Sequence, residues 1–108
     1  MSKHFRVIYS SEAFEDLKSI YSYIAVKLKA RDTAKKLTDH IRNEIRSLGE
    51  MPERYAQVDW EPWASMGMHK LPIDYYVVFY LVDNKAMCVS IVRIFYGGRD
   101  IETIAREL

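Results

Sequence analysis

Two amphipathic stretches separated by only a few residues constrain the fold of this chain more than any other feature. In both, apolar residues recur at intervals of three and four positions, which is the period of a helix with one buried face. The stripes comprise Ala13, Leu17, Ile20, Ile24 and Leu28 in the first stretch and Ala34, Leu37, Ile41, Ile45 and Leu48 in the second. Because the connection, Lys29-Ala30-Arg31, is short, the two stretches predict an antiparallel helical hairpin.

The residues that flank these stretches are typical helix ends. Ser10-Ser11 offers side-chain oxygens to cap the first helix, and Asp32 or Thr33 is expected to cap the second. Gly49 and Pro52 end the second helix, because glycine adopts the left-handed turn and proline cannot continue the hydrogen-bond ladder.

The rest of the chain has the composition and alternation of β-strands joined by turns. Strands are predicted at His4–Tyr9, Met68–Pro72, Tyr75–Val82 and Ala86–Tyr96. In the first of them, Phe5, Val7 and Tyr9 share one face. Residues 53–64 are expected to form a loop that bears Trp60 and Trp63, and a short helix is expected from Asp100 to Leu108.

The order strand, helix, helix and three strands predicts an α+β fold. We expect the antiparallel helical hairpin to pack on one face of a twisted, mainly antiparallel four-stranded sheet, with a short C-terminal helix. A chain of 108 residues can build one core of this kind, and it contains no repeat or linker. Residues 1–108 are therefore predicted to form a single domain.

Charge and residue content exclude several function classes. Residues 1–52 carry 10 Lys or Arg against 7 Asp or Glu, whereas residues 53–108 carry 6 against 8, so the C-terminal half is not suited to generic phosphate binding. The histidines at 4, 40 and 69 lack metal-ligand spacing, so we expect neither a metal nor another cofactor. The single Cys88, the short apolar runs and the absence of a secretory pattern indicate a cytoplasmic protein.

Several short motifs follow one another along nearly the whole chain. They are Tyr9-Ser10-Ser11-Glu12-Ala13 with Asp16-Leu17, Ile20-Tyr21-Ser22-Tyr23-Ile24, Leu48 with Pro52-Glu53-Arg54, Gly67–Pro72, Tyr76–Tyr80 and Ile91–Asp100. In this order and spacing, the chain resembles the RelE/ParE superfamily of toxins from bacterial toxin–antitoxin pairs. Its Val-Val-Phe-Tyr stretch, two long helices and acidic C-terminal half are similar to the ParE branch.

This resemblance implies a toxin that a cognate antitoxin neutralises, acting through one of two mechanisms. RelE-like members cut mRNA in the ribosomal decoding site, whereas ParE-like members poison DNA gyrase without being nucleases. The RNA-cutting relatives place an Arg where this chain has Val77, and some place a His where it has Phe95. Since neither side chain can stabilise a phosphorane or move a proton, the resemblance favours gyrase inhibition by binding.

A ribosome-dependent endoribonuclease is the alternative, and its candidate catalytic residues are Lys70, Arg93 and Tyr96. Lys70 matches a basic position of the family on the second strand, or is a solvated lysine on an edge strand. Arg93 needs a partner inside an apolar strand, or points off the sheet and pairs with a carboxylate such as Asp100. A second alternative is an inactive relative that serves as a protein-binding module.

The candidate binding residues are Phe14, Tyr21, Trp60, Trp63 and Arg99. Phe14 and Tyr21 widen the first helical stripe beyond what one sheet face needs, so we expect an antitoxin contact there and at a sheet edge near 5–9 or 68–72. The two tryptophans are interpreted as interface anchors or as packing onto the hairpin. Arg99, beside Asp100, is interpreted as holding the C-terminal turn.

Overall fold

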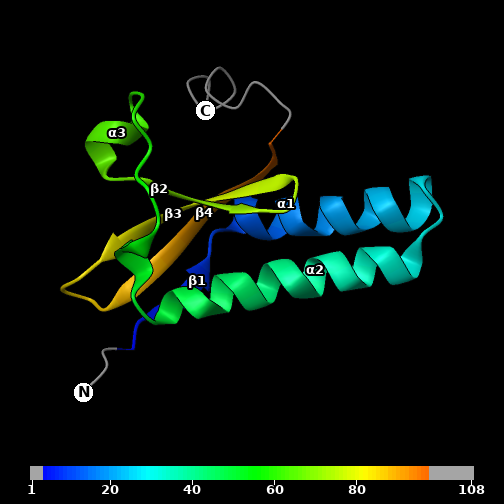
Figure 1. The fold of residues 1–108 in the computed structure, drawn as a ribbon, viewed down its shortest axis with the longest axis horizontal. Helices are drawn as coiled ribbons and strands as arrows, with labels where there is room; N and C mark the ends of the chain where they lie inside the picture. The colour runs from blue at the N-terminus through cyan, green and yellow to red at the C-terminus, as the bar shows by residue number, and fades with distance from the viewer. Residues whose placement is uncertain (1–3, 98–108) are drawn as a thin grey trace.

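The structure is a computed structural model that describes residues 4–97, and the helix predicted from Asp100 lies outside these residues. Its elements along the chain are β1 (Arg6–Tyr9), α1 (Ser11–Ser22), a π-helical turn η1 (Tyr23–Lys27), α2 (Arg31–Arg46), two 3₁₀ turns η2 (Ser47–Gly49) and η3 (Pro52–Arg54), α3 (Trp63–Met66), β2 (His69–Ile73), β3 (Tyr76–Asp83) and β4 (Cys88–Tyr96). The α+β class is confirmed, with two long helices against a four-stranded sheet (Figure 1).

The helical hairpin forms where the apolar spacing predicts it. Ser10 caps α1, its hydroxyl accepting a hydrogen bond from the backbone N–H of Ala13 at 2.9 Å. The expected side-chain cap of α2 is wrong. The chain turns through Lys29 at a positive φ of 53°, so α2 begins directly at Arg31 and its N-cap position, Ala30, makes no side-chain cap.

The sheet has the strand order β1-β4-β3-β2, with β1 parallel to β4 and the other two pairs antiparallel. Each strand lies within two residues of its predicted bounds. The pairing of β3 with β4 shifts register at one point, because Phe79 lies opposite Arg93 whereas Tyr80 lies opposite Ile91. Val92 is therefore an extra residue in β4, a β-bulge that bends the strand locally.

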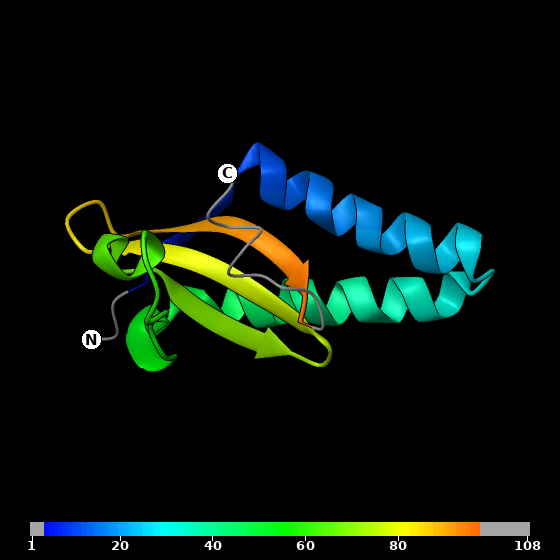
Figure 2. The ribbon, with the colours of Figure 1, turned by 90° about the horizontal axis from the view of Figure 1, so that it is seen from above.

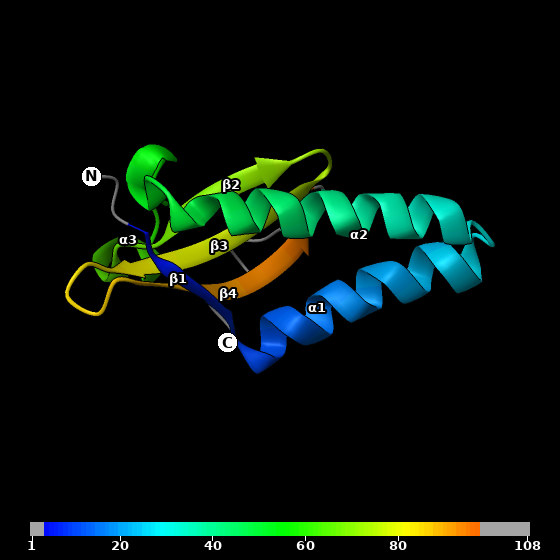
Figure 3. The ribbon, with the colours of Figure 1, turned by 90° about the horizontal axis from the view of Figure 1, so that it is seen from below.

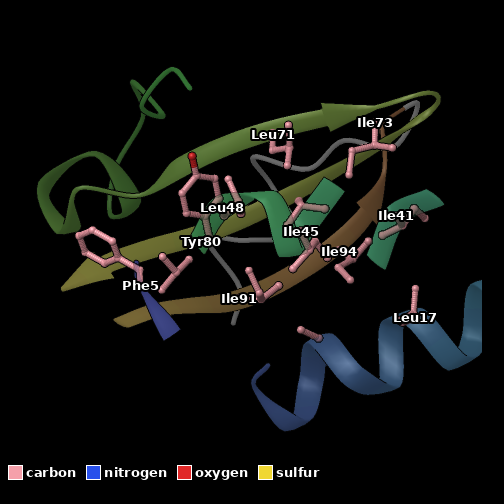
Figure 4. Close-up of a cluster of buried hydrophobic side chains, with 13 residues drawn as sticks. Phe5, Leu17, Ile41, Ile45, Leu48, Leu71, Ile73, Tyr80, Ile91 and Ile94 are labelled. Carbon is pink, nitrogen blue, oxygen red and sulfur yellow. The ribbon is translucent and has the colours of Figure 1, made fainter. Parts of the chain in front are cut away.

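The main core lies between the hairpin and the sheet, and both long helices cover the same sheet face (Figures 2 and 3). Phe5, Leu17, Ile41, Ile45, Leu48, Leu71, Ile73, Tyr80, Ile91 and Ile94 point toward one another in this layer (Figure 4). Fully burying side chains of this size stabilises a domain by about 1.5–3 kcal/mol each before the entropy of ordering the chain is counted.

A second, smaller cluster covers part of the opposite sheet face. It contains Val58, Trp63, Met68, Phe79 and Phe95. The segment predicted as a plain loop at 53–64 thus includes η3 and leads into α3, and its tryptophans pack on the sheet instead of the hairpin. Trp63 stacks on Trp60 with ring centroids 5.1 Å apart and lies 4.7 Å from the ring of Phe79.

Candidate functional site

The free edge of β4 is closed by side chains from the start of the hairpin. Strand β1 ends at Tyr9, so β4 has no strand partner on that side beyond Ile91. The Ser10 hydroxyl donates to the Val92 carbonyl at 2.8 Å, and the Asp16 carboxylate accepts from the Ile94 backbone N–H at 2.9 Å. These two side chains satisfy backbone groups that a further residue of β1 would otherwise pair.

Arg93 is held by the same carboxylate. Its Nε and one terminal nitrogen donate to the two oxygens of Asp16 at 2.7 and 3.0 Å, and its guanidinium lies 4.4 Å from the centre of the Phe95 ring. The hydrogen bonds that Arg93 donates to Asp16 raise the pKa of Arg93 above its usual value. The interpretation of Arg93 as an arginine paired with a carboxylate is confirmed, but its partner is Asp16; Asp100 lies outside the described residues.

The three candidate catalytic residues do not converge. Lys70 and Arg93 both lie opposite Phe79, on either side of it. Neighbouring strands are about 4.8 Å apart, so these two backbones are separated by roughly 10 Å. Phe79 itself is 2% exposed and covered by Trp63, so buried aromatic side chains lie between the two residues on this face of the sheet.

Tyr96 lies on the other side of the sheet, where it is paired with Tyr76 and their rings are 5.8 Å apart. A cleft of about 580 Å³ opens beside them, lined by Asp16, Ser19, Ile20, Tyr23, Tyr76, Ile94, Phe95 and Tyr96. Burial and the neighbouring Tyr96 and Tyr23 raise the pKa of Tyr76 above its usual value. Because Asp16 is committed to Arg93 and Ile94, this cleft lacks a free carboxylate among the described residues to act as a base near neutral pH.

His69 is buried and has a structural role between the sheet and the segment after the hairpin. It is 6% exposed, its Nδ1 lies 2.9 Å from the Tyr55 carbonyl oxygen, and its ring stacks on Tyr80 at 5.2 Å. Tyr80 donates in turn to the Pro52 carbonyl at 2.6 Å, and burial raises the pKa of this phenol well above its usual value. The pair fixes the segment after the hairpin onto the sheet.

The candidate binding residues fall into two groups. Phe14 and Tyr21 are 48% and 40% exposed on α1. Trp63 is only 5% exposed, because β3 and β4 present Phe79 and Phe95 to it, so it is not an exposed anchor. Trp60 is partly buried against the same cluster. Arg99 lies outside the described residues.

A groove runs beside Phe14, between β1 and the end of α2. It has a volume of about 370 Å³ and is lined by Val7, Tyr9, Phe14, Leu17, Arg42, Ile45 and Arg46. Burial raises the pKa of Tyr9, and the positive charges of Arg42 and Arg46 act in the opposite direction. Sequence reasoning missed these two arginines and Asp16. The arginines could have been placed beside the core, because each directly follows a residue of the apolar stripe, Ile41 or Ile45.

The two edges of the sheet differ in accessibility. Both segments predicted as edges, 5–9 and 68–72, lie at edge strands. The β2 edge is partly covered, because Val58 donates its N–H to the Met68 carbonyl at 2.8 Å and Ala56 accepts from the Lys70 N–H at 3.0 Å. On β1, Arg6 and Ser10 direct their N–H groups to β4, so the peptide groups of Val7 between them point outward.

Within residues 4–97, no group of three or more His, Cys, Asp or Glu side chains is placed to bind a metal ion. Over the same residues, no helix has both the length and the apolar character needed to cross a bilayer. Cys88 is buried, as expected from its place in an apolar strand.

Solved structures of toxin–antitoxin proteins share this fold. The chain is similar to a structure of the chromosomal ParDE system from P. aeruginosa, with 22% identity, a TM-score of 0.70, and coverage of 88% of this chain and 98% of that one. It is also similar to the RelBE2 toxin–antitoxin complex from Mycobacterium tuberculosis, with 17% identity, a TM-score of 0.60, and coverage of 86% and 91%. The isolated E. coli RelE toxin matches with 14% identity, a TM-score of 0.53, and coverage of 96% and 99%.

The sequence comparison defines the family more narrowly. No curated protein matches the chain significantly. The family model described as the ParE toxin of the type II toxin–antitoxin system parDE matches residues 7–101, which include most of β1, the whole hairpin and the other three strands of the sheet. The chain therefore belongs to the ParE toxin family of type II toxin–antitoxin systems.

Proposed function

We propose that this chain is a toxin that acts by binding DNA gyrase and that a cognate antitoxin neutralises it. The observation that carries the binding mechanism is the pairing of Arg93 with Asp16 through both carboxylate oxygens. An arginine held in this way is not available to a phosphorane, and Phe79 separates it from Lys70. The family, whose description names parDE, supports gyrase as the target in preference to the ribosome.

The experiment that tests this function compares two purified systems. The toxin is added to gyrase with relaxed plasmid, and separately to ribosomes translating a defined mRNA. We expect inhibition of supercoiling, with the mRNA left intact. Cleavage of the mRNA in the ribosomal decoding site would contradict the proposal and support the endoribonuclease alternative.

Variants of the candidate catalytic residues sharpen the comparison. Lys70→Ala and Tyr96→Phe remove a cation and a hydroxyl without disturbing the buried core, since Lys70 is partly exposed and Tyr96 is 49% exposed. A binding toxin keeps its inhibition of growth in both variants. A nuclease that uses these groups would lose about 10²–10⁴-fold in rate, the usual contribution of a general acid or base.

The second alternative, an inactive binding module, is tested in living bacteria. We expect expression from a tight promoter to stop thymidine incorporation before methionine incorporation, because gyrase supports replication. A chain that leaves both rates and the growth of the culture unchanged is a binding module without toxicity.

We propose that the antitoxin binds along β1 and into the groove beside Phe14. The outward peptide groups of Val7 can pair with an added strand, which is a common mode of peptide recognition. Phe14 offers an exposed ring, and Arg42 and Arg46 offer cations to acidic residues of the antitoxin. The covered β2 edge is less suited to this role.

The antitoxin site is tested by affinity. Phe14→Asp places a charge in the groove, and we expect the dissociation constant for the antitoxin to rise at least tenfold. Tyr21→Ala tests the far margin of the same helix, and Lys85→Ala, in the exposed turn between β3 and β4, is the matched surface control. Unchanged affinity of the Phe14→Asp variant would contradict this site.

A further inference from the structure

The end of the helical hairpin extends past the sheet and forms a surface of its own, the hairpin tip, which we define as residues 23–36. Figures 1 and 3 show the end of α1 and the start of α2 reaching beyond the strands. The tip has a fixed shape, because the Leu28 N–H donates to the Tyr23 carbonyl at 3.2 Å and the Ala30 N–H donates to the Ile24 carbonyl at 3.0 Å. A small core of Ile24, Ala25 and Ala34 supports it.

Apolar side chains on the tip remain in water. Tyr23, Val26 and Leu28 are 56%, 70% and 57% exposed, within six consecutive residues. Val26 borders a hollow of about 620 Å³, which is lined by Ala25, Val26, Lys29, Ala30, Arg31, Asp32 and Thr33. Three large apolar groups around one turn are unusual for a surface that faces only solvent.

Positive charge is concentrated at the same place. Residues 23–36 contain five Lys or Arg and one acidic residue, Asp32, which gives +4, so the remaining residues of a chain with net charge +1 sum to −3. Lys35 is paired with Asp39 at 2.7 Å. Lys27, Lys29, Arg31 and Lys36 form no ion pair with another described residue. Lys29 and Arg31 line the same hollow as Val26.

We propose that the hairpin tip docks on an acidic protein surface with an apolar centre, and that this surface belongs to the target of the toxin. The inference rests on the proposed function, because it assigns the tip to the protein that the toxin inhibits. Val26 and Leu28 favour a protein over a nucleic acid, since aliphatic groups have no counterpart among phosphates and do not serve as stacking platforms for bases.

The tip is separate from the proposed antitoxin groove. Phe14 and Val26 are 12 positions apart along the same helical segment, which corresponds to roughly 18 Å at 1.5 Å per residue. Substitutions at one surface are therefore expected to leave the other intact. Target binding and antitoxin binding become separable properties of the chain.

Two variants of the tip test the proposal. Lys27→Glu with Lys29→Glu reverses its charge, and Val26→Ser with Leu28→Ser removes its exposed apolar groups; neither pair contributes a buried residue. The matched control is Arg54→Glu with Lys85→Glu, an equal change of charge at exposed positions outside both the tip and the proposed antitoxin site. Each protein is checked for an unchanged melting temperature and for antitoxin affinity within twofold of the original.

Growth arrest is the first measurement, because it does not presume the identity of the target. We expect the control to arrest growth like the original chain, and both tip variants to lose arrest. Arrest that persists in the tip variants overturns the proposal, as does an original chain that leaves growth unaffected. Binding of the original chain to duplex DNA that the charge variant loses would also overturn it, in favour of a nucleic-acid contact.

The supercoiling assay then distinguishes the proposal from the proposed function. If gyrase is the target, the tip variants need at least tenfold more protein for half-inhibition. If the original chain arrests growth without inhibiting gyrase, gyrase as target fails, while the loss of arrest in the tip variants still supports the tip.

Discussion

Replacing Asp16 by Ala removes the side chain that joins α1 to the free edge of β4. The carboxylate accepts three hydrogen bonds, two from Arg93 and one from the Ile94 N–H. Its side chain is 16% exposed and that of Arg93 is 19% exposed, so water reaches the pair only partly. The variant leaves a cation and a backbone donor without their acceptor at the margin of the main core.

The magnitude follows from these contacts. A hydrogen bond to a charged group contributes about 1.5–3 kcal/mol, and removing one partner of a largely buried pair costs about 3–5 kcal/mol. Because the residual exposure lets water replace part of the loss, we expect the free energy of unfolding to fall by about 3 kcal/mol. For a domain of this size that corresponds to a melting temperature lower by about 12 °C.

Urea unfolding followed by circular dichroism measures the change, with thermal unfolding as a second reading. Arg93→Met is expected to cost only about 1–2 kcal/mol, because Asp16 still accepts from Ile94 and no cation is left unpaired. The double variant then gives the coupling energy between the two side chains. If Asp16→Ala lowers the free energy of unfolding by less than about 1 kcal/mol, the pair does not hold the hairpin to the sheet. Arg93 would then again be a candidate catalytic residue.

Three further predictions concern single contacts. Tyr80→Phe removes the hydrogen bond to the Pro52 carbonyl and should lower the free energy of unfolding by about 1–1.5 kcal/mol at pH 7, read from urea curves. Because the pKa of Tyr80 is raised in the folded state, the phenol of the unfolded chain ionises at a lower pH than that of the folded chain. The contribution of Tyr80 to the free energy of unfolding is therefore full below about pH 10 and decreases as the pH rises above it. Tyr80→Phe should flatten that alkaline loss, and an equal loss in both proteins would contradict the assignment. Ile41→Ala, at a fully buried core position, should cost about 3 kcal/mol in the same assay, and a cost under about 1 kcal/mol would refute the packing. Met51 is 73% exposed and has a φ of 51°, a conformation that glycine adopts with less strain than methionine. Met51→Gly should therefore raise the free energy of unfolding by about 0.5–1 kcal/mol and with it the melting temperature, and a lower melting temperature would contradict this.

Much of the fold was readable from local periodicity. The stripe from Ile41 to Leu48 specifies a helix and the face that it buries, and alternation in residues 76–96 specifies strands that pair through a short turn. The stop at Gly49 and Pro52 follows from backbone conformation alone. The prediction that Asp32 caps the second helix was wrong, because the turn through Lys29 lets the second helix begin directly at Arg31.

Contacts between distant residues could not be read in this way. The partner of Arg93 lies 77 positions earlier in the chain, and the sequence also offers other carboxylates, including Asp100, as partners. The tryptophans were interpreted as interface anchors or as packing onto the hairpin, whereas they pack on the opposite face of the sheet. Only the pairing of β3 with β4, which brings Phe79 and Phe95 together, provides that surface.

The sequence by itself determined the two long helices, the four strands, their order and the family, because each depends on neighbours within a few positions or on motifs in a fixed order. The tertiary structure decided which side chains meet: that Asp16 engages Arg93, that Phe79 separates Arg93 from Lys70, and that β1 leaves Val7 on an open edge. The physical reason is that side-chain chemistry depends on distance in space, and strand order sets that distance without leaving a periodic signal in the chain.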